Sequence, residues 1–561
     1  MPVNGQQTSD RLSSATSYQH AQLPSSSFDQ QSRRFLPPLY HHTRTSSGAR
    51  SISDDRRFQE CNDDDDDESI PGEWSEIDSA KEALLERAQN FSITYDIDRG
   101  CRGTELKFCS FARPHMRAFH ASWICFFTSF FVQFSQAPLL PAMQKSLLLT
   151  KSDLWWTNLW MMVGGIPMRF VLGPLCDKYG ARSTMTYLLA AIAVPSALTG
   201  VVAVNLPTLT VIRMLLGAMD TFVPGQYWIT CQFVREVGGT AMALAGGLGA
   251  TGSGVTQLVT GSVFFPLMLR YFHGNDDLAW RWSLVVPAVL AAVVSCYFYR
   301  YSDDCPLGNF VEVKKAGLML ERSAVDSFRS GACNLNAWIL LLQYAGSCGV
   351  DFTMCNGAAM YFHAQFGQTI AASGAYAFLY GLSAVFARGV GGWISDKASD
   401  KFSLRGRLWV QLVCIVMQGL LNIWFARTTR LDHSVVIMVV FSILVQMSMG
   451  TCYGIVPYVD GPNTGSIAGI VGGGGNVGAA LLARMFMTVD YAKAMEYMGW
   501  FTIFTSLFTP FIVIRGYRGI LFGTDDAEGS ASRKQHSPLL VPGKVTHSPH
   551  LVSVQRRQLQ R

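Results

Sequence analysis

Twelve apolar segments, each long enough to cross a lipid bilayer as a helix, dominate the chain from residue 118 onward. Backbone groups in lipid must bond within their own helix, so such a series folds as a helical membrane bundle. The segments are 118–140, 153–175, 184–204, 207–233, 239–268, 281–301, 337–363, 372–394, 408–426, 434–457, 464–487 and 497–516. The sequence therefore predicts an all-α polytopic membrane protein with twelve transmembrane helices.

The composition agrees with this class of protein. Of the 561 residues, 49% are hydrophobic and only 15% are charged, whereas about a quarter are charged in soluble domains. The net charge of +5 reflects the loops more than any basic face and argues neither for nor against nucleic acid. For a membrane protein we expect the lipid bilayer and no nucleic acid as a partner. The thirteen cysteines form no Cys-x-x-Cys pair, and no nucleotide loop or nucleophile arrangement is present. We expect no metal, no cofactor and no enzymatic activity.

The apolar segments fall into two groups of six, separated by a polar connection. The predicted parts are a disordered cytoplasmic tail (1–115), a six-helix bundle (116–301), a cytoplasmic loop (302–336), a second six-helix bundle (337–518) and a disordered cytoplasmic tail (519–561). Lysine and arginine collect in the loops that a cytoplasmic N-terminus places inside the cell. This bias favours a cytoplasmic location for both termini.

A glycine-rich stretch occurs twice. Gly472–Gly478 reads Gly-Gly-Gly-Gly-Asn-Val-Gly, and an offset of 226 residues places it on Gly246–Gly252. In a membrane bundle such glycines allow another backbone, or a small ligand, to approach closely. Ala250 falls on Asn476, so the two copies differ by one polar side chain. The chain is thus two copies of one design.

An arginine precedes an aspartate by eight residues at the end of both the second and the eighth segment. The pairs are Arg169 with Asp177 and Arg388 with Asp396, and a lysine follows each aspartate. An Asp-Lys pair at this place resembles the loop signature of the major facilitator superfamily. The resemblance implies the fold of that superfamily, in which two six-helix bundles enclose a central site.

Both arginines are expected near the bilayer midplane. Eight residues place each guanidinium about 12 Å above its aspartate, and the hydrocarbon half-thickness is about 15 Å. By depth, Asp220 and Asp351 are the nearest acids, and an ion pair with one of them remains the alternative. We expect instead that both arginines lack an acidic partner and converge on a cavity. Two planar donor groups there would hold a planar oxyanion.

The segment around Tyr453-Gly-Ile-Val-Pro457, continued by Gly472–Gly478, resembles the second nitrate signature of the nitrate/nitrite porter family. Gly246 to Leu258 resembles its first signature. The resemblance implies that Arg169 and Arg388 grip nitrate from opposite sides and that Phe222 and Tyr344 complete the pocket. It also implies that the glycine-rich helices gate the passage. The gating glycines would be Gly246, Gly247, Gly249, Gly472, Gly473, Gly475 and Gly478.

Two positions depart from the family pattern. The first signature usually has asparagine where this chain has Ala250, and an aromatic residue usually stands at the position of Cys348. With Asn476, these positions are expected to line the substrate site. A site that lacks one amide and one ring should be larger and less selective. Nitrite or another small anion therefore stays open beside nitrate.

We expect a secondary transporter of nitrate, and of nitrite, that works by alternating access in the plasma membrane. Uptake of an anion against a negative interior costs about 2.3 kcal/mol per charge and 100 mV, and the resemblance implies proton symport. Asp220 and Asp351 are the candidate proton carriers. The candidate cytoplasmic gate consists of Asp177, Lys178, Arg182, Asp396 and Lys397. The alternatives are an antiporter for organic phosphates or carboxylates and a receptor that binds nitrate without transport.

Overall fold

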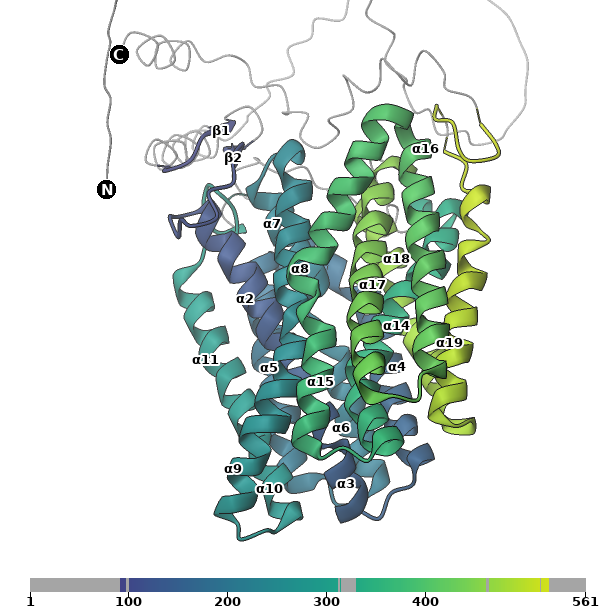
Figure 1. The fold of residues 1–561 in the computed structure, drawn as a ribbon. Coiled ribbons are helices and arrows are strands. Elements are labelled where there is room, and N and C mark those ends of the chain that lie inside the picture. The colour runs from purple at the N-terminus through teal and green to yellow at the C-terminus, as the bar shows by residue number, and fades with distance from the viewer. Residues whose placement is uncertain are drawn as a thin grey trace, which may run out of the picture. The chain divides into compact units, whose positions relative to one another are not determined.

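The structure, a computed structural model, describes residues 91–96, 100–310, 313, 329–460, 464–514 and 516–523. Long helices run side by side through this part of the chain (Figure 1). Residues 1–90 and 524–561, which belong to the two predicted tails, lie outside the described residues, as does most of the predicted loop between 311 and 328.

The first half begins with a short hairpin of β1 (Tyr95–Asp96) and β2 (Arg102–Gly103). Its helices are α2 (His115–Gln133), α3 (Leu140–Ser146), α4 (Lys151–Tyr179), α5 (Ala181–Val202), α6 (Leu206–Ala218), α7 (Phe222–Gln232), α8 (Arg235–Leu258), α9 (Phe265–Tyr271), α10 (Asp276–Ser283) and α11 (Val285–Tyr301). The second half contains α14 (Leu335–Phe366), α15 (Ile370–Leu382), α16 (Ala384–Arg427), α17 (Leu431–Val459), α18 (Thr464–Thr488) and α19 (Tyr491–Ser506).

The helices account for twelve crossings. Nine helical segments of the described residues are long and apolar enough to cross a membrane. One of them, Ile370–Arg427, reverses direction at Ser403, where φ is 57°, and so crosses twice. Helices α14 and α19 run alongside the others and add the remaining two crossings (Figure 1). The predicted all-α fold with twelve helices is confirmed.

Polar side chains set the ends of several helices. Thr150 and Asp153 form a capping box that satisfies free amides at the start of α4. Asn205 and Thr208 form a similar pair at the start of α6. The long α14 ends at Gly367, whose φ of 62° suits a residue without a side chain.

The N-terminal tail differs from the prediction in its last part, because residues 91–96 and 100–113 pack against the helices. The His115 ring is hydrogen-bonded to the Cys101 carbonyl (2.8 Å), and Val234 N donates to the Gly103 carbonyl (3.0 Å). Ile93, Phe119 and Phe233 share one apolar cluster. The hydrophobic side chains among polar neighbours in this stretch explain the packing, which the predicted boundary at residue 115 missed.

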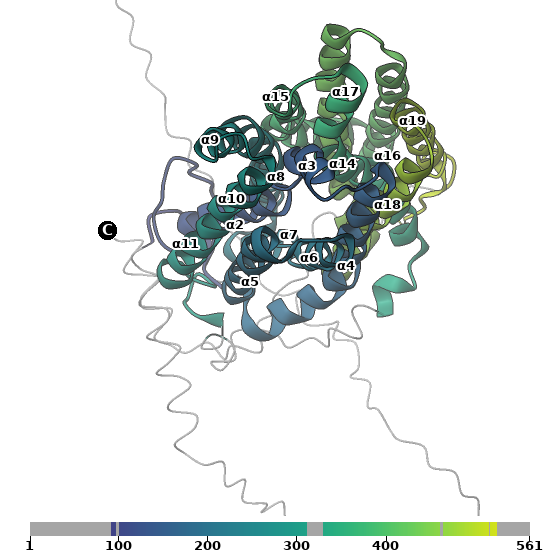
Figure 2. The same ribbon diagram turned by 90° about the horizontal axis from the view of Figure 1, so that it is seen from below.

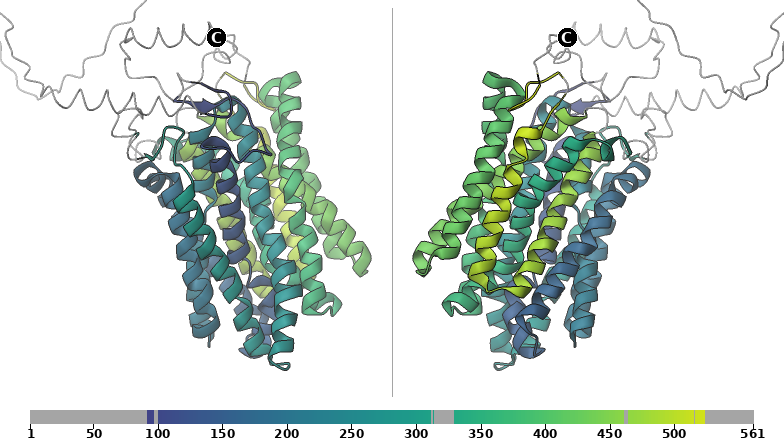
Figure 3. Two further views of the ribbon diagram at one scale, coloured as in Figure 1. Left: turned by 90° about the vertical axis from the view of Figure 1, so that its left-hand side faces the viewer. Right: turned by 90° about the vertical axis from the view of Figure 1, so that its right-hand side faces the viewer.

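The two halves of the bundle lie on separate sides, as Figure 2 shows. They meet where α18 packs against α4 and where α15 and α16 pack against α8. Figure 3 shows the same helices from two sides. We call the face that carries β1, β2 and the Ser403 turn the terminal face, and the face that carries α3, α9 and α10 the far face (Figure 1). The functional residues lie between the halves and between these faces.

Candidate substrate site

Asp220 lies in a break between two helices. The helix α6 ends at Ala218 and α7 begins at Phe222, so the backbone around Asp220 is released from the helical ladder. Asp220 Oδ1 accepts a hydrogen bond from Phe222 N (2.8 Å), at the start of α7. The second oxygen is thereby free to face α4. Interrupted helices of this kind supply polar groups at the middle of a membrane bundle.

Arg169 of α4 is paired with that second oxygen. Its Nη2 lies 2.5 Å from Asp220 Oδ2, and both side chains are buried. Its Nε donates to Asn476 Oδ1 (3.0 Å) on α18. The expectation that both arginines lack an acidic partner is wrong for Arg169. The two charges compensate each other. The sequence did not indicate this pair, because the break after α6 is what turns Asp220 toward α4.

Arg388 of α16 is held in a different way. Its Nη2 donates to Gln446 Oε1 (3.0 Å), and its Nη1 donates to the Gly246 carbonyl (3.3 Å). The amide nitrogen of Gln446, Nε2, donates in turn to Asp351 Oδ1 (3.0 Å). No ion pair of Arg388 occurs among the described residues. Gln446 thus connects the second arginine to the second buried acid without direct charge pairing.

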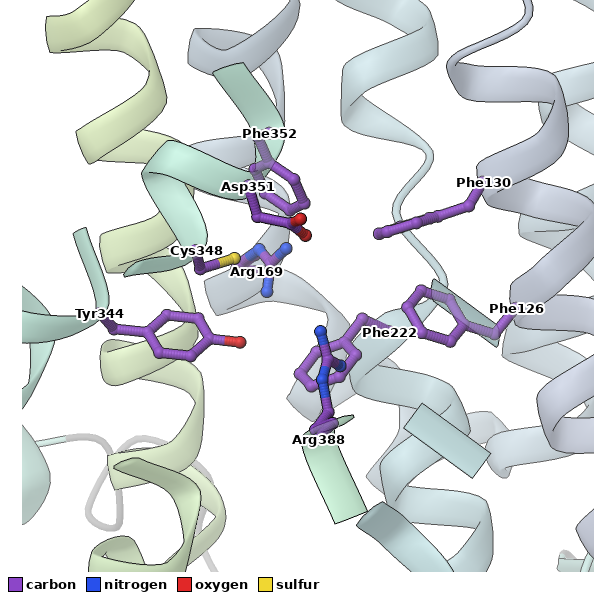
Figure 4. A pocket seen from close by; sticks show the side chains of 9 residues that line it. All are labelled: Phe126, Phe130, Arg169, Phe222, Tyr344, Cys348, Asp351, Phe352 and Arg388. Atoms are coloured by element: carbon purple, nitrogen blue, oxygen red, sulfur yellow. The ribbon is translucent and has the colours of Figure 1, made fainter. Parts of the chain in front are cut away.

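Both arginines face one small cavity between the halves (Figure 4). The residues that line it are Phe126, Phe130, Arg169, Phe222, Tyr344, Cys348, Asp351, Phe352 and Arg388. The cavity has a volume of about 10 Å³, which is about the space that one water molecule needs. The side chains around the site therefore leave room for about one water molecule.

The ring missing at Cys348 is supplied one turn later. Phe352 lines the cavity, and its ring centroid lies 5.8 Å from the Arg169 guanidinium carbon. The Phe222 ring lies 5.6 Å from the same carbon. Both distances suit a cation held against an aromatic face. Phe352 thus adds an aromatic wall one turn after Cys348, and the predicted larger size of the site stays a prediction.

The two glycine-rich copies of the internal repeat lie in equivalent places, each beside one of the two arginines. A side-chain carbon added to Gly472 would lie 3.1 Å from Arg169 Nη1, and one added to Gly246 would lie 3.4 Å from Arg388 Nη1. Asn476 lies behind Arg169 and is not among the residues that line the cavity. Ala250 is buried and does not line it either. The Nε of Arg388 has no hydrogen-bond partner among the described residues, whereas Asn476 accepts from the Nε of Arg169.

The glycines proposed as gates divide into two groups. Gly246, Gly247, Gly472 and Gly473 face the opposite half, where their closest neighbours include Arg388, Ala384, Arg169 and Phe170. Gly249, Gly475 and Gly478 pack within their own half. A side-chain carbon on Gly475 would lie 2.6 Å from Cys348 Sγ of α14. These three glycines allow neighbouring helices of one half to pack closely, and their predicted gating role stays a prediction.

The residues predicted to form the cytoplasmic gate lie at the terminal face. The Arg182 Nη2 lies 3.4 Å from Asp304 Oδ2, on the chain that follows α11. Asp396 Oδ1 lies 2.6 Å from Arg407 Nη1 on the same helical hairpin. Burial raises the pKa of the Asp304 carboxyl, against the opposing effect of the Arg182 guanidinium. Neither ion pair bridges the halves, so the gating role predicted for Arg182 and Asp396 has no support here.

The other two gate candidates with described side chains are exposed. Lys178 lies beside the Tyr179 ring, and Lys397 projects from α16. The side chain of Asp177 lies outside the described residues.

The sequence prediction missed four side chains at the site. Phe126, Phe130 and Phe352 line the cavity, and Gln446 holds Arg388. A glutamine within the apolar segment 434–457 was the available signal for Gln446, because a buried amide needs partners. Among the described residues, no group of three or more histidine, cysteine, aspartate or glutamate side chains could hold a metal ion.

The fold and the paired central arginines define a membrane transporter of two six-helix halves. The Major Facilitator Superfamily profile matches residues 122–517, and the chain belongs to that superfamily. Within it, the sequence relatives make the chain a member of the nitrate/nitrite porter family.

One such relative is high affinity nitrate transporter 2.7 of Arabidopsis thaliana, with 31% identity over 77% of this chain and 90% of the relative. Nitrate transporter 2.1 of Chlamydomonas reinhardtii is 32% identical over 76% of this chain and 80% of the relative. The nitrate/nitrite transporter NrtP of Picosynechococcus sp. is 26% identical over 67% and 85%. Among solved structures, a D-xylose-proton symporter matches with a TM-score of 0.55, 12% identity and coverage of 70% of this chain and 97% of that one, which shows the fold alone.

Proposed function

We propose that this protein carries nitrate, and also nitrite, across a membrane by alternating access around the central cavity. One observation carries the proposal: Arg169 and Arg388, one from each half, face the same cavity (Figure 4). Planar guanidinium groups suit a small planar anion, and the aromatic walls exclude water from it. Curated relatives of the chain are named as nitrate transporters, which supports the substrate class.

We propose that transport is coupled to protons through Asp220 and Asp351. Asp220 neutralises Arg169, and Asp351 is linked to Arg388 through Gln446. With both acids ionised, two positive and two negative charges cancel, so an anion meets no net attraction. Protonation of an acid removes that competitor and makes an arginine available. Two protons and one nitrate would carry one net positive charge, which a negative interior drives inward.

We place the protein in the plasma membrane with the terminal face toward the cytoplasm. Lys178 lies in the last turn of α4, and Lys397, Lys401 and Arg405 flank the Ser403 turn of α16 at this face. The described chain also begins and ends at this face (Figure 1). An excess of lysine and arginine on the cytoplasmic side is the rule for helical membrane proteins. A cysteine introduced at Lys397 should react with an impermeant thiol reagent only from the cytoplasmic side.

The test uses the purified chain in liposomes. An inward proton gradient and a negative interior should drive accumulation of isotopically labelled nitrate and produce an inward current. Chlorate and nitrite should compete, and Arg388→Gln should abolish the accumulation. Binding of nitrate without flux in correctly inserted protein would contradict transport and support a receptor. Flux without any current or proton dependence would leave transport but contradict proton symport.

A further inference from the structure

Arg213 of α6 is a buried cation that the central site does not use. It is 1% exposed and lies between α4, α6 and α14. Its Nη1 donates to Thr157 Oγ1 (3.2 Å), its Nη2 donates to Asn356 Oδ1 (2.9 Å), and Nη2 also contacts Met161 Sδ at 3.4 Å. All three partners are neutral.

The charge of Arg213 is uncompensated. Among the described residues no carboxylate lies within ion-pair distance of it, and its Nε has no hydrogen-bond partner. A charged arginine at this depth costs at least a few kcal/mol in the membrane. Arg169, in contrast, has Asp220 as its counter-charge. A cation in these surroundings is suited to bind an anion when the halves separate.

A second unpaired polar group lies at the same level. Asn158 follows Thr157 on α4, is 2% exposed, and neither its Oδ1 nor its Nδ2 has a partner among the described residues. Trp155, three residues earlier and so on the same side of α4, lies against Gly357 of α14, next to Asn356. The two asparagines and Arg213 thus belong to one layer between the halves.

This layer lies on the far-face side of the central cavity. Arg213 precedes Asp220 by seven residues, which corresponds to about 10 Å along a helix. Asn356 follows Asp351 of α14 by five residues in the same direction, about 7 Å. The Arg213–Asn356 hydrogen bond joins the first half to the second. Opening of the far face must therefore break this bond and release one more guanidinium donor.

We propose that Arg213, with the amides of Asn158 and Asn356, forms a second binding site for a small oxyanion, which receives the anion from the far face before it reaches Arg169 and Arg388. The site forms when the halves separate on that side. The Nε and Nη2 groups of Arg213 then offer two parallel donors, which fit two oxygens of one planar anion. Closure returns Arg213 to Asn356 and moves the anion inward. The inference rests on the proposed nitrate transport.

The experiment compares nitrate transport from the two faces of oriented liposomes. Arg213→Gln should raise the KM for nitrate supplied at the far face about tenfold, while the KM at the terminal face stays unchanged. Arg213→Lys, which keeps the charge without the planar donors, should fall between wild type and Arg213→Gln. Arg484→Gln serves as the control, because Arg484 is an exposed arginine near the far-face end of α18. It should leave both KM values unchanged.

Asn158→Ala guards against loss of folding, because the substitution removes an amide that has no partner in the described part of the chain. It should raise the far-face KM severalfold and leave the terminal-face KM unchanged. Equal changes at both faces, or unchanged far-face KM in Asn158→Ala and in Arg213→Lys, would overturn the second site. Absence of nitrate flux in the wild type would instead contradict the proposed function.

Discussion

Arg169 Nη2 and Asp220 Oδ2 lie 2.5 Å apart in the interior of the bundle, where both side chains are almost inaccessible. The contact removes the free positive charge that a substrate anion would need on this side of the cavity. It also provides a way to restore it, because a protonated Asp220 no longer competes for the guanidinium. In the proposed mechanism, binding of an anion and binding of a proton are thereby coupled through one side chain.

The first prediction concerns this pair. Asp220→Asn should mimic the protonated acid and retain nitrate affinity at high pH, whereas wild-type affinity should weaken as the pH rises. Gradient-driven accumulation should be lost. Removal of one partner from a buried ion pair costs about 3–5 kcal/mol, because the other charge is left unpaired. Nitrate bound at Arg169 would compensate that charge, so nitrate should raise the melting temperature of the variant more than that of the wild type. Nitrate titrations over a range of pH measure both effects.

Asp276→Asn is the control for that prediction, since Asp276 pairs with the exposed Lys145 at the far face, away from the cavity. Its pH dependence should match the wild type. If Asp220→Asn kept the wild-type pH dependence of nitrate affinity, Asp220 would have no part in the coupling.

The second prediction concerns the other arginine. Arg388 donates through Nη1 to Gly246 and through Nη2 to Gln446, and a single lysine ammonium cannot reproduce this geometry. Arg388→Lys should therefore reduce nitrate affinity at least tenfold, which is about 1.4 kcal/mol. Arg300→Lys, at an exposed position of α11, should have no effect. Wild-type affinity in a correctly inserted Arg388→Lys protein would argue that Arg388 does not contact the anion.

The sequence was sufficient to predict the twelve helices and the positions of both arginines. The length of the apolar segments determines the helices, and the eight-residue spacing from an aspartate at the end of the segment determines the positions of the arginines. The partners of the arginines depend on local geometry that the spacing does not contain. The break at residues 219–221 turns Asp220 toward α4. Gln446 stands out as a polar residue in its segment, but the sequence does not show that it reaches Arg388. The position of the Phe352 ring could not be predicted either, because it depends on how α14 is rotated.

The third prediction separates glycines between the halves from glycines within one half. A side-chain carbon on Gly247 would lie 2.7 Å from the Ala384 carbonyl oxygen of the opposite half, so Gly247→Ala should hold the halves apart and slow transport severalfold. A side-chain carbon on Gly478 would clash with the Ala345 carbonyl oxygen of the same half. Gly478→Ala should therefore chiefly lower the melting temperature.

Gly389→Ala provides the matched control for both glycine variants, because no heavy atom lies within 4 Å of the added carbon. It should alter neither the transport rate nor the melting temperature. Slower transport in Gly478→Ala at unchanged stability, together with a wild-type rate in Gly247→Ala, would reverse the assignment of the two groups.

The last prediction uses the one polar position in which the two repeats differ. Asn476 accepts a hydrogen bond from Arg169 Nε, whereas Arg388 Nε has no partner among the described residues and Ala250 occupies the equivalent place. Ala250→Asn should supply the missing acceptor and hold the Arg388 guanidinium in place before the anion binds. A hydrogen bond to a charged group contributes about 1.5–3 kcal/mol when its geometry is good.

The new amide must fit a buried position, so we expect a severalfold rather than a hundredfold gain in nitrate affinity. Ala250→Leu is the size-matched control, because leucine fills a similar volume and accepts no hydrogen bond. It should bind nitrate no better than the wild type. Nitrate titrations of the wild type, both single variants and an Ala250→Asn, Arg388→Lys double variant measure the coupling between the two positions. Lysine has no Nε–H group to occupy the new acceptor, so the gain should vanish in the double variant. A gain of equal size with and without Arg388 would show that the asparagine acts elsewhere.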